Sequence, residues 1–213
     1  MKRGRFITFE GGEGGGKSTQ LRHLAERLGG AGQEVVATRE PGGSPGGEAI
    51  RALLVQGEAD RWSPVTETLL MYAARRDHIE RVIAPALARG AWVLCDRYAD
   101  STRAYQGAGG GTDPALIAAL ESHVLGGVTP DLTLILDLPP ETGLARAAAR
   151  AGAETRFESK GLDFHARLRE GFLGIAAAEP ERCEVIDATA PLETVAAAIW
   201  AAVRRRLELA AHG

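Results

Sequence analysis

Short apolar runs alternate along the chain with longer stretches in which apolar residues recur at helical spacing. The short runs are rich in β-branched and aromatic residues. We expect strands at residues 5–9, 34–38, 91–95, 132–137 and 183–187. Strands that alternate with helices are typical of a parallel sheet covered by helices on both faces. The pattern therefore predicts an α/β fold with a five-stranded parallel sheet.

The intervening stretches predict the helices. Their expected ranges are 18–28, 48–54, 64–88, 114–125, 140–150, 162–178 and 192–209. Two of them follow a short polar residue and begin with proline, at Ser63-Pro64 and Asp113-Pro114. This is a common helix start, because the polar side chain accepts a hydrogen bond from a backbone N–H of the first turn and proline fits the first helical position.

Glycine gathers in two segments, 41–47 and 107–111, which suit either flexible linkers or functional loops. Each segment follows an expected strand and a polar motif, and loops at the carboxyl edge of a parallel sheet commonly bind ligands. We therefore expect functional loops at both places. A chain of 213 residues can bury one substantial core, so we expect a single domain over 1–213.

The composition narrows the class of protein. A formal charge of −3 offers no overall basic field for DNA or RNA, so anions must be bound by individual arginines. Cys95 and Cys183 adjoin apolar runs, which suits buried free thiols in the cytoplasm better than a disulfide. The N-terminus has no apolar signal region and no later run is long enough to span a bilayer, so we expect neither secretion nor membrane insertion.

Residues 11–18 match the phosphate-binding pattern GxxxxGK[ST], directly after the first expected strand and before a helix. Glycines let backbone N–H groups turn toward phosphate oxygens, and the helix adds the positive end of its dipole. In this motif the lysine reaches the β- and γ-phosphates and the hydroxyl binds Mg²⁺. We expect ATP and Mg²⁺ here, bound by Gly11, Gly12, Glu13, Gly14, Gly15, Gly16, Lys17, Ser18 and Thr19. The alternative is a glycine-rich turn without a ligand.

Asp96 ends the apolar run 92–95 and is a second candidate for the metal site. A carboxylate at the end of a buried strand can lie opposite the phosphate loop, beside Mg²⁺. An aspartate in this position also commonly caps the following turn. Ser18 and Asp96 are therefore the expected metal residues.

The wider sequence favours a small kinase over other nucleotide-binding proteins. The chain contains no asparagine, so it lacks the Asn-Lys-x-Asp motif that reads guanine in GTPases. Motor ATPases are usually larger than 213 residues. The chain has instead a group of arginines and a segment, 146–160, that fits a lid.

The chain resembles the bacterial thymidylate kinases over essentially its whole length. The similar segments are 9–20, 38–43 (TREPGG), 67–87, 95–107 (CDRYADSTRAYQG), 130–146 and 156–164. The resemblance implies a three-layer P-loop fold, transfer of the γ-phosphate of ATP to dTMP, and a homodimer formed through the long helix. The alternatives are another small P-loop kinase that acts on nucleosides or other nucleotides, and an ATP-binding regulatory module without turnover.

The resemblance also implies roles for single residues. Arg97 follows Asp96 and lies between the donor and acceptor phosphates, where a guanidinium can stabilise the charge of the transition state. Arg51 is the candidate for the dTMP phosphate, and Glu40 lines the same site. Arg39 either lines this site too or pairs with Glu40 or solvent, so it is not among the expected site residues.

The base is read from the long helix and from the segment after Asp96. Met71 stands where phenylalanine is commoner, and Arg75, on the same helix face, bonds the base. Tyr72 beside Met71 is either core or an alternative base contact. Ser101 and Gln106 are implied to bond the pyrimidine edge, and Tyr105 to close the space beside C2′ of the sugar.

The lid is implied to supply an arginine to the transferred phosphate. The P-loop carries Glu13 where other members carry arginine, which resembles the class with a catalytic arginine in the lid. Arg150 is our candidate, with Arg146 and Arg156 as alternates, and a solvated arginine-rich helix face is the other interpretation. Glu13 then faces the acceptor sugar or a water on Mg²⁺.

Overall fold

The computed structural model describes residues 3–58, 60–149 and 156–207. At their centre lies a sheet of five strands in the order β2-β3-β1-β4-β5, and all neighbouring strands run parallel. The strands are β1 (Phe6–Glu10), β2 (Val35–Arg39), β3 (Trp92–Asp96), β4 (Leu132–Asp137) and β5 (Cys183–Asp187). The α/β class and the five parallel strands are confirmed, and three strands begin and end one residue later than predicted.

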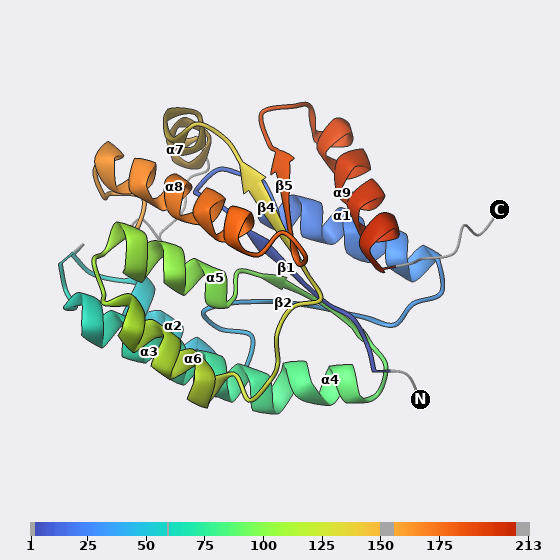
Figure 1. Cartoon of the computed structure of the whole chain (residues 1–213), viewed down its shortest axis with the longest axis horizontal. Coiled ribbons are helices and arrows are strands. Elements are labelled where there is room, and N and C mark those ends of the chain that lie inside the picture. The colour runs from blue at the N-terminus through green and yellow to red at the C-terminus, as the bar shows by residue number, and fades with distance from the viewer. Residues whose placement is uncertain (1–2, 59, 150–155, 208–213) are drawn as a thin grey trace.

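Helices α1 (Lys17–Gly30) and α9 (Leu192–Leu207) cover one face of the sheet (Figure 1). Side chains alternate along a strand, so Ile7 and Phe9 of β1 point to this face and are fully buried against leucines of α1 and aliphatic residues of α9. This packing holds the start of α1 close to the end of β1. The loop between them is the glycine-rich phosphate motif.

One long helical rod packs on the opposite face, against β1 and β3. It consists of α3 (Pro64–His78), a π-helical turn η1 (Ile79–Ile83) and α4 (Ala84–Ala88). The predicted helix over 64–88 is therefore confirmed. The predicted cap is also confirmed, because the Ser63 side chain accepts a hydrogen bond from the backbone N–H of Thr66 at 3.2 Å.

Four further helices are α2 (Pro45–Val55), α6 (Pro114–Val124), α7 (Pro140–Ala148) and α8 (Leu162–Ala178). Asp113 caps α6 as predicted, accepting from the N–H of Ala115 at 2.8 Å. In Figure 1, α2, α3, α6 and α4 lie together on the side of the sheet away from α1 and α9.

One prediction about the glycine segments is wrong. Residues 99–109 are helical, as α5 (Ala99–Thr102) and the π-helical η2 (Arg103–Gly109), so most of the segment 107–111 is not a loop. Its glycines are packing positions: a Cβ on Gly109 would lie 2.6 Å from the ring of Phe164 on α8. The segment 41–47 is a loop as far as Ser44, and α2 begins at Pro45, three residues earlier than predicted.

Cys95 and Cys183 are both buried free thiols, as predicted. Across the described ranges, every helix is too short or too polar to cross a membrane.

Candidate functional site

The loop between β1 and α1 is shaped by glycines with backbone conformations that other residues rarely adopt. Gly11, Gly14 and Gly16 have φ angles of 124°, 68° and 78°. A Cβ on Gly14 would also lie 2.0 Å from the carbonyl oxygen of Gly143 on α7. The loop thus curls around the N-terminus of α1, where free backbone N–H groups and the helix dipole favour phosphate.

Lys17 is the first residue of α1 and folds back over this loop. Its Nζ atom donates hydrogen bonds to the carbonyl oxygens of Gly11, at 3.2 Å, and Gly12, at 2.6 Å. Burial and the neighbouring Arg97 charge lower the pKa of Lys17 to about 8. The ammonium group is therefore held inside the loop, largely removed from water.

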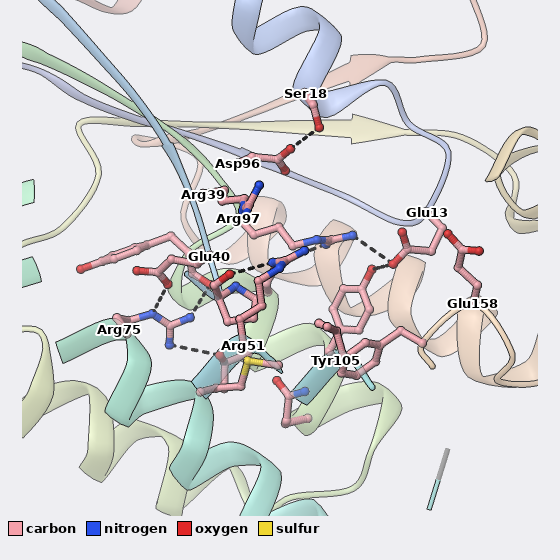
Figure 2. A pocket seen from close by; sticks show the side chains of 18 residues that line it. Glu13, Ser18, Arg39, Glu40, Arg51, Arg75, Asp96, Arg97, Tyr105 and Glu158 are labelled. Carbon is pink, nitrogen blue, oxygen red and sulfur yellow. Dashed lines mark hydrogen bonds and ion pairs between the residues drawn. The ribbon is translucent and has the colours of Figure 1, made fainter. Parts of the chain in front are cut away.

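Ser18 and Asp96 meet where α1 begins and β3 ends. The Ser18 hydroxyl donates to Oδ2 of Asp96 at 2.5 Å, and Figure 2 shows this contact at the edge of the cavity. Hydroxyl and carboxylate oxygens are the donors that Mg²⁺ prefers, and proteins often supply only one or two of its ligands, the others being phosphates and waters. The pair therefore fits Mg²⁺. Within the described ranges no group of three or more His, Cys, Asp or Glu side chains is arranged to hold a metal. Thr19 follows in the first turn of α1.

Arg97 is the one described residue other than glycine with a positive φ, at 71°. Its backbone N–H extends the β1–β3 ladder by donating to Phe9 O at 2.9 Å, so the strained conformation begins directly at the end of the sheet. This turn directs the guanidinium toward the P-loop, where Nη1 donates to Gly11 O at 3.0 Å and to Ser101 Oγ at 3.2 Å.

Arg97, Glu13 and Tyr105 form a compact group between the P-loop and η2 (Figure 2). One oxygen of Glu13, Oε1, accepts from Nη2 of Arg97 at 3.1 Å and from the Tyr105 hydroxyl at 2.6 Å. The guanidinium also lies 4.7 Å from the centre of the Tyr105 ring. Burial alone would raise the pKa of Glu13, but the charges of Arg97 and Lys17 outweigh it and lower the pKa to about 2. Glu13 is therefore a carboxylate at any physiological pH.

Glu10, at the end of β1, bonds to residues next to this group. It was not predicted from the sequence. Its side chain is fully buried and accepts from the backbone N–H of Tyr98 at 2.7 Å and from the Ser101 hydroxyl at 2.5 Å. Tyr98 follows Arg97 in the chain, and Ser101 accepts a hydrogen bond from the Arg97 guanidinium. Burial and the nearby charge of Asp100 raise the pKa of Glu10 to about 7.

A cavity of about 640 Å³ opens beside Arg97. Its walls come from the P-loop and the start of α1, the loop after β2, α2, α3, the segment from β3 to η2, and residues 157 and 158 before α8. It is lined by Glu13, Ser18, Arg39, Glu40, Pro41, Arg51, Val55, Met71, Arg75, Asp96, Arg97, Tyr98, Ser101, Thr102, Tyr105, Gln106, Phe157 and Glu158. Every residue predicted for the acceptor site is among them.

Arg75 and Glu40 form a buried ion pair in the wall of this cavity. Arg75 is 2% exposed, and its Nε donates to Oε2 of Glu40 at 2.7 Å. Its other two nitrogens donate to Thr102 Oγ1 at 3.1 Å and to Tyr98 O at 2.9 Å. Oε1 of Glu40 lies 3.0 Å from Nδ1 of His78. The guanidinium is thus fixed by protein groups, and a bond from Arg75 to a base stays a prediction.

Met71, and not Tyr72, faces the cavity. Met71 packs on Leu54 and Val55 of α2. Tyr72 lies in the core, with its hydroxyl 3.2 Å from Oε1 of Glu121. Of the two interpretations of Tyr72, the structure supports core packing and not a base contact.

Arg51 reaches the cavity from α2, and its Nη1 donates to Pro41 O at 2.7 Å. Arg39 also lines the cavity, but its ion-pair partner is Glu48, with Nη2 3.1 Å from Oε2. The alternative in which Arg39 pairs with Glu40 is therefore wrong, because Glu40 is bound by Arg75 and His78. The Arg39 side chain is 56% exposed, which agrees with the alternative in which it faces solvent.

Gln106 lies in η2, and its Nε2 atom donates to Oε1 of Glu67 on α3 at 2.8 Å. The other Glu67 oxygen accepts from Nη1 of Arg156. Arg156 was predicted as an alternate lid arginine, yet it is 3% exposed and bonds to α2 and α3. Arg146 donates to Ala188 O, after β5, at 2.8 Å. Arg150, the preferred candidate, lies outside the described residues.

Comparison with known proteins supports one family. Residues 9–199 match the family model described as thymidylate kinase. The chain is 72% identical over 209 residues to a thymidylate kinase of Caulobacter vibrioides, covering 98% of this chain and 100% of that protein. It is 57% identical to a thymidylate kinase of Bradyrhizobium diazoefficiens, covering 96% and 91%. The crystal structure of thymidylate kinase from Ehrlichia chaffeensis is 35% identical, covers 94% of this chain and 99% of that chain, and superposes with a TM-score of 0.77.

Proposed function

Because the chain belongs to the thymidylate kinase family, we propose that the P-loop and the adjoining cavity transfer the γ-phosphate of ATP to dTMP, giving dTDP and ADP. The observation that carries this assignment is the position of Arg97, whose guanidinium contacts both the P-loop and the cavity wall. An arginine at this junction can bind the donor and the acceptor phosphates together.

On the donor side, Lys17 neutralises the β- and γ-phosphates, and residues 11–19 wrap around them. Mg²⁺ held by Ser18 and Asp96 would supply further positive charge to the phosphates. The hydrogen bonds of Lys17 to loop carbonyls support this role, because the same ammonium group can turn to phosphate oxygens within the loop.

Arg97 then stabilises the charge that spreads over the transferred phosphoryl group. Its left-handed backbone holds the guanidinium in place before substrates bind, so less reorganisation is needed in the transition state. Asp96, directly before it, orients the donor side through Ser18. The transfer is in line from ATP to dTMP, without a covalent enzyme intermediate.

On the acceptor side, the arginine on α2, Arg51, binds the dTMP phosphate. Met71 offers an adaptable apolar contact to the base, and six other lining residues bind its edge and the sugar. These are Glu13, Glu40, Arg75, Ser101, Tyr105 and Gln106. Tyr105 is held by Glu13 and Arg97, which supports its use as a rigid wall beside the sugar.

We assign the segment 146–160 of this single P-loop kinase domain to a lid that closes over ATP and excludes water. Arg150 is the proposed lid arginine. Its alternates are engaged elsewhere: Arg156 with α2 and α3, and Arg146 with the carbonyl of Ala188.

A homodimer is proposed on the outer side of α3. Val65 and Leu69 of α3 are 46% and 48% exposed, and Leu53 of the neighbouring α2 is 41% exposed. Such a group of exposed large apolar residues favours association. Leu69→Glu should shift the molecular mass in sedimentation from dimer to monomer. We place the enzyme in the cytoplasm, where two buried free thiols suit a reducing compartment.

The assignment is tested by measuring ADP release from ATP with dTMP, with and without Mg²⁺. Wild-type protein should release ADP only when dTMP and Mg²⁺ are both present. Lys17→Ala should lose at least about a hundredfold in kcat, because the substitution removes the positive charge that would contact the transferred phosphate. Arg22→Ala, on the exposed side of α1, is the control for a lost positive charge. Near wild-type turnover of Lys17→Ala would overturn the P-loop assignment.

A further inference from the structure

Gln106 is held by a buried carboxylate that no prediction from the sequence included. Its Nε2 atom lies 2.8 Å from Oε1 of Glu67, and the two side chains are 2% and 5% exposed. Gln106 also lines the cavity beside Arg97. One end of its amide is thus bound inside the protein, and the other end is left for a ligand.

Glu67 determines which end of the Gln106 amide is left for a ligand. A glutamine amide can turn over and present either its NH₂ donor or its carbonyl acceptor. An ionised carboxylate only accepts hydrogen bonds, so the NH₂ group of Gln106 must face Glu67. The carbonyl oxygen Oε1 of Gln106 is therefore directed away from Glu67 as an acceptor.

Arg156 keeps Glu67 an acceptor. Its Nη1 donates to the second oxygen of Glu67, and the same guanidinium donates to Leu54 O at 3.1 Å and Glu58 O at 3.0 Å. Both members of the ion pair are buried, at 1% and 6% side-chain exposure. The ion pair therefore fixes the Glu67 carboxylate at the place where its other oxygen accepts from Gln106.

We propose that Glu67 is a specificity-determining positioning residue that orients the Gln106 amide so that the cavity selects a pyrimidine with an N3–H donor. Thymine and uracil carry this imide N–H, whereas cytosine has an unprotonated ring nitrogen at the same place. An acceptor facing that nitrogen loses a hydrogen bond and repels it. This inference rests on the proposed function, since it concerns the acceptor nucleotide of the same reaction.

The test is the substrate preference of Glu67→Gln. The new amide can donate as well as accept, so Gln106 becomes free to turn over. We compare kcat/KM for dTMP, dUMP and dCMP, because dTMP and dUMP share the N3–H edge and dCMP lacks it. The ratio of dTMP to dCMP should fall by about tenfold or more, the usual effect of one buried hydrogen bond on discrimination. The ratio of dTMP to dUMP should stay within about twofold, since both bases present the same edge.

Two further variants separate orientation from general damage. Arg156→Lys retains a cation beside Glu67 and should retain the wild-type ratio of dTMP to dCMP. Gln106→Leu removes the amide and should lose the discrimination, after which adding Glu67→Gln should have no further effect on the ratio. A purely structural role of Glu67 does not produce this non-additivity.

An equal loss of kcat/KM for all three nucleotides in Glu67→Gln, or an unchanged ratio of dTMP to dCMP, would overturn the proposal. If Glu67→Gln alone fails to fold, the neutral pair Glu67→Gln/Arg156→Gln carries the same measurement with the same criteria. A wild-type protein that phosphorylates none of the three would instead contradict the proposed function.

Discussion

The Nη2 atom of Arg97 lies 3.1 Å from Oε1 of Glu13, so the loop after β3 is joined to the P-loop by an ion pair. Both side chains are mostly buried, at 16% and 17% exposure, and the Tyr105 hydroxyl bonds the same Glu13 oxygen. The P-loop and the cavity beside it therefore share one charged group. A change at Arg97 should affect the transfer step more than the binding of either substrate.

The charge of Arg97 should affect catalysis, and its strained backbone should affect stability. Two substitutions distinguish these effects. Arg97→Ala and Arg97→Gly both remove the guanidinium, so each should lower kcat by about 10³-fold or more, the usual effect of an arginine on phosphoryl transfer. Glycine tolerates the φ of 71° and alanine does not. Arg97→Gly should therefore be more stable than Arg97→Ala by about 1 kcal/mol in urea unfolding. Equal stability would show that the backbone relaxes.

Glu10 should make the stability depend on pH. The folded protein raises the pKa of Glu10 from 4.5 to about 7, so the proton on Glu10 stabilises the fold at low pH and this contribution is lost as the pH rises through about 7. Glu10→Gln cannot ionise and has no such loss. The free energy of unfolding of Glu10→Gln, relative to that of wild type, should therefore increase between about pH 5 and pH 8 by on the order of 3 kcal/mol.

Urea titrations at several pH values measure this difference. Glu26→Gln, an exposed position on α1, is the control. A constant difference between Glu10→Gln and wild type across the range would contradict the buried, proton-binding state of Glu10.

Arg75 should be important for stability as well as for substrate binding. Arg75→Ala leaves Glu40 as a buried carboxylate without its main partner, which costs about 3–5 kcal/mol. Arg75→Met/Glu40→Gln removes both charges and should recover most of this loss. Arg81→Ala, which removes an exposed arginine from the same rod, should change the unfolding midpoint little. If the double variant is no more stable than Arg75→Ala, the ion pair is not the cause.

Arg150→Ala should lower kcat with little effect on ATP binding, because a lid arginine meets the phosphoryl group mainly in the closed, reacting state. Steady-state kinetics and equilibrium ATP titration give the two quantities separately. Weaker ATP binding with unchanged kcat would make Arg150 a ground-state contact. A severe effect of Arg146→Ala with none of Arg150→Ala would move the role to Arg146.

The strands and most helices could be predicted because their apolar positions repeat at the spacing of the element. The helix over 99–109 could not, since its last turn holds two glycines, Gly107 and Gly109, which favour a loop. They are tolerated because they let η2 approach its neighbours: a Cβ on Gly107 would lie 3.1 Å from Ile117. Tertiary packing here outweighs local propensity.

The P-loop and the residues that line the cavity could be predicted because they lie in contiguous motifs. Glu10 and Glu67 could not, although both are charged residues buried beside the site. Glu10 bonds Ser101, 91 positions away, and Glu67 bonds Gln106, 39 positions away. Such pairs become visible only when the chain is folded. Glu10 follows an apolar run, as Asp96 does. This position is the sequence signal that could have indicated a carboxylate at the site.

The most direct test of the account is ADP release across a panel of nucleoside monophosphates, with thymidine as a non-phosphorylated control. The wild-type enzyme should prefer dTMP over purine monophosphates and ribonucleotides by roughly one to two decades in kcat/KM, because each mismatch buries an unpaired polar group or clashes with Tyr105. Thymidine should not be phosphorylated. A purine nucleotide or the free nucleoside phosphorylated as efficiently as dTMP would contradict the assignment of the cavity to dTMP.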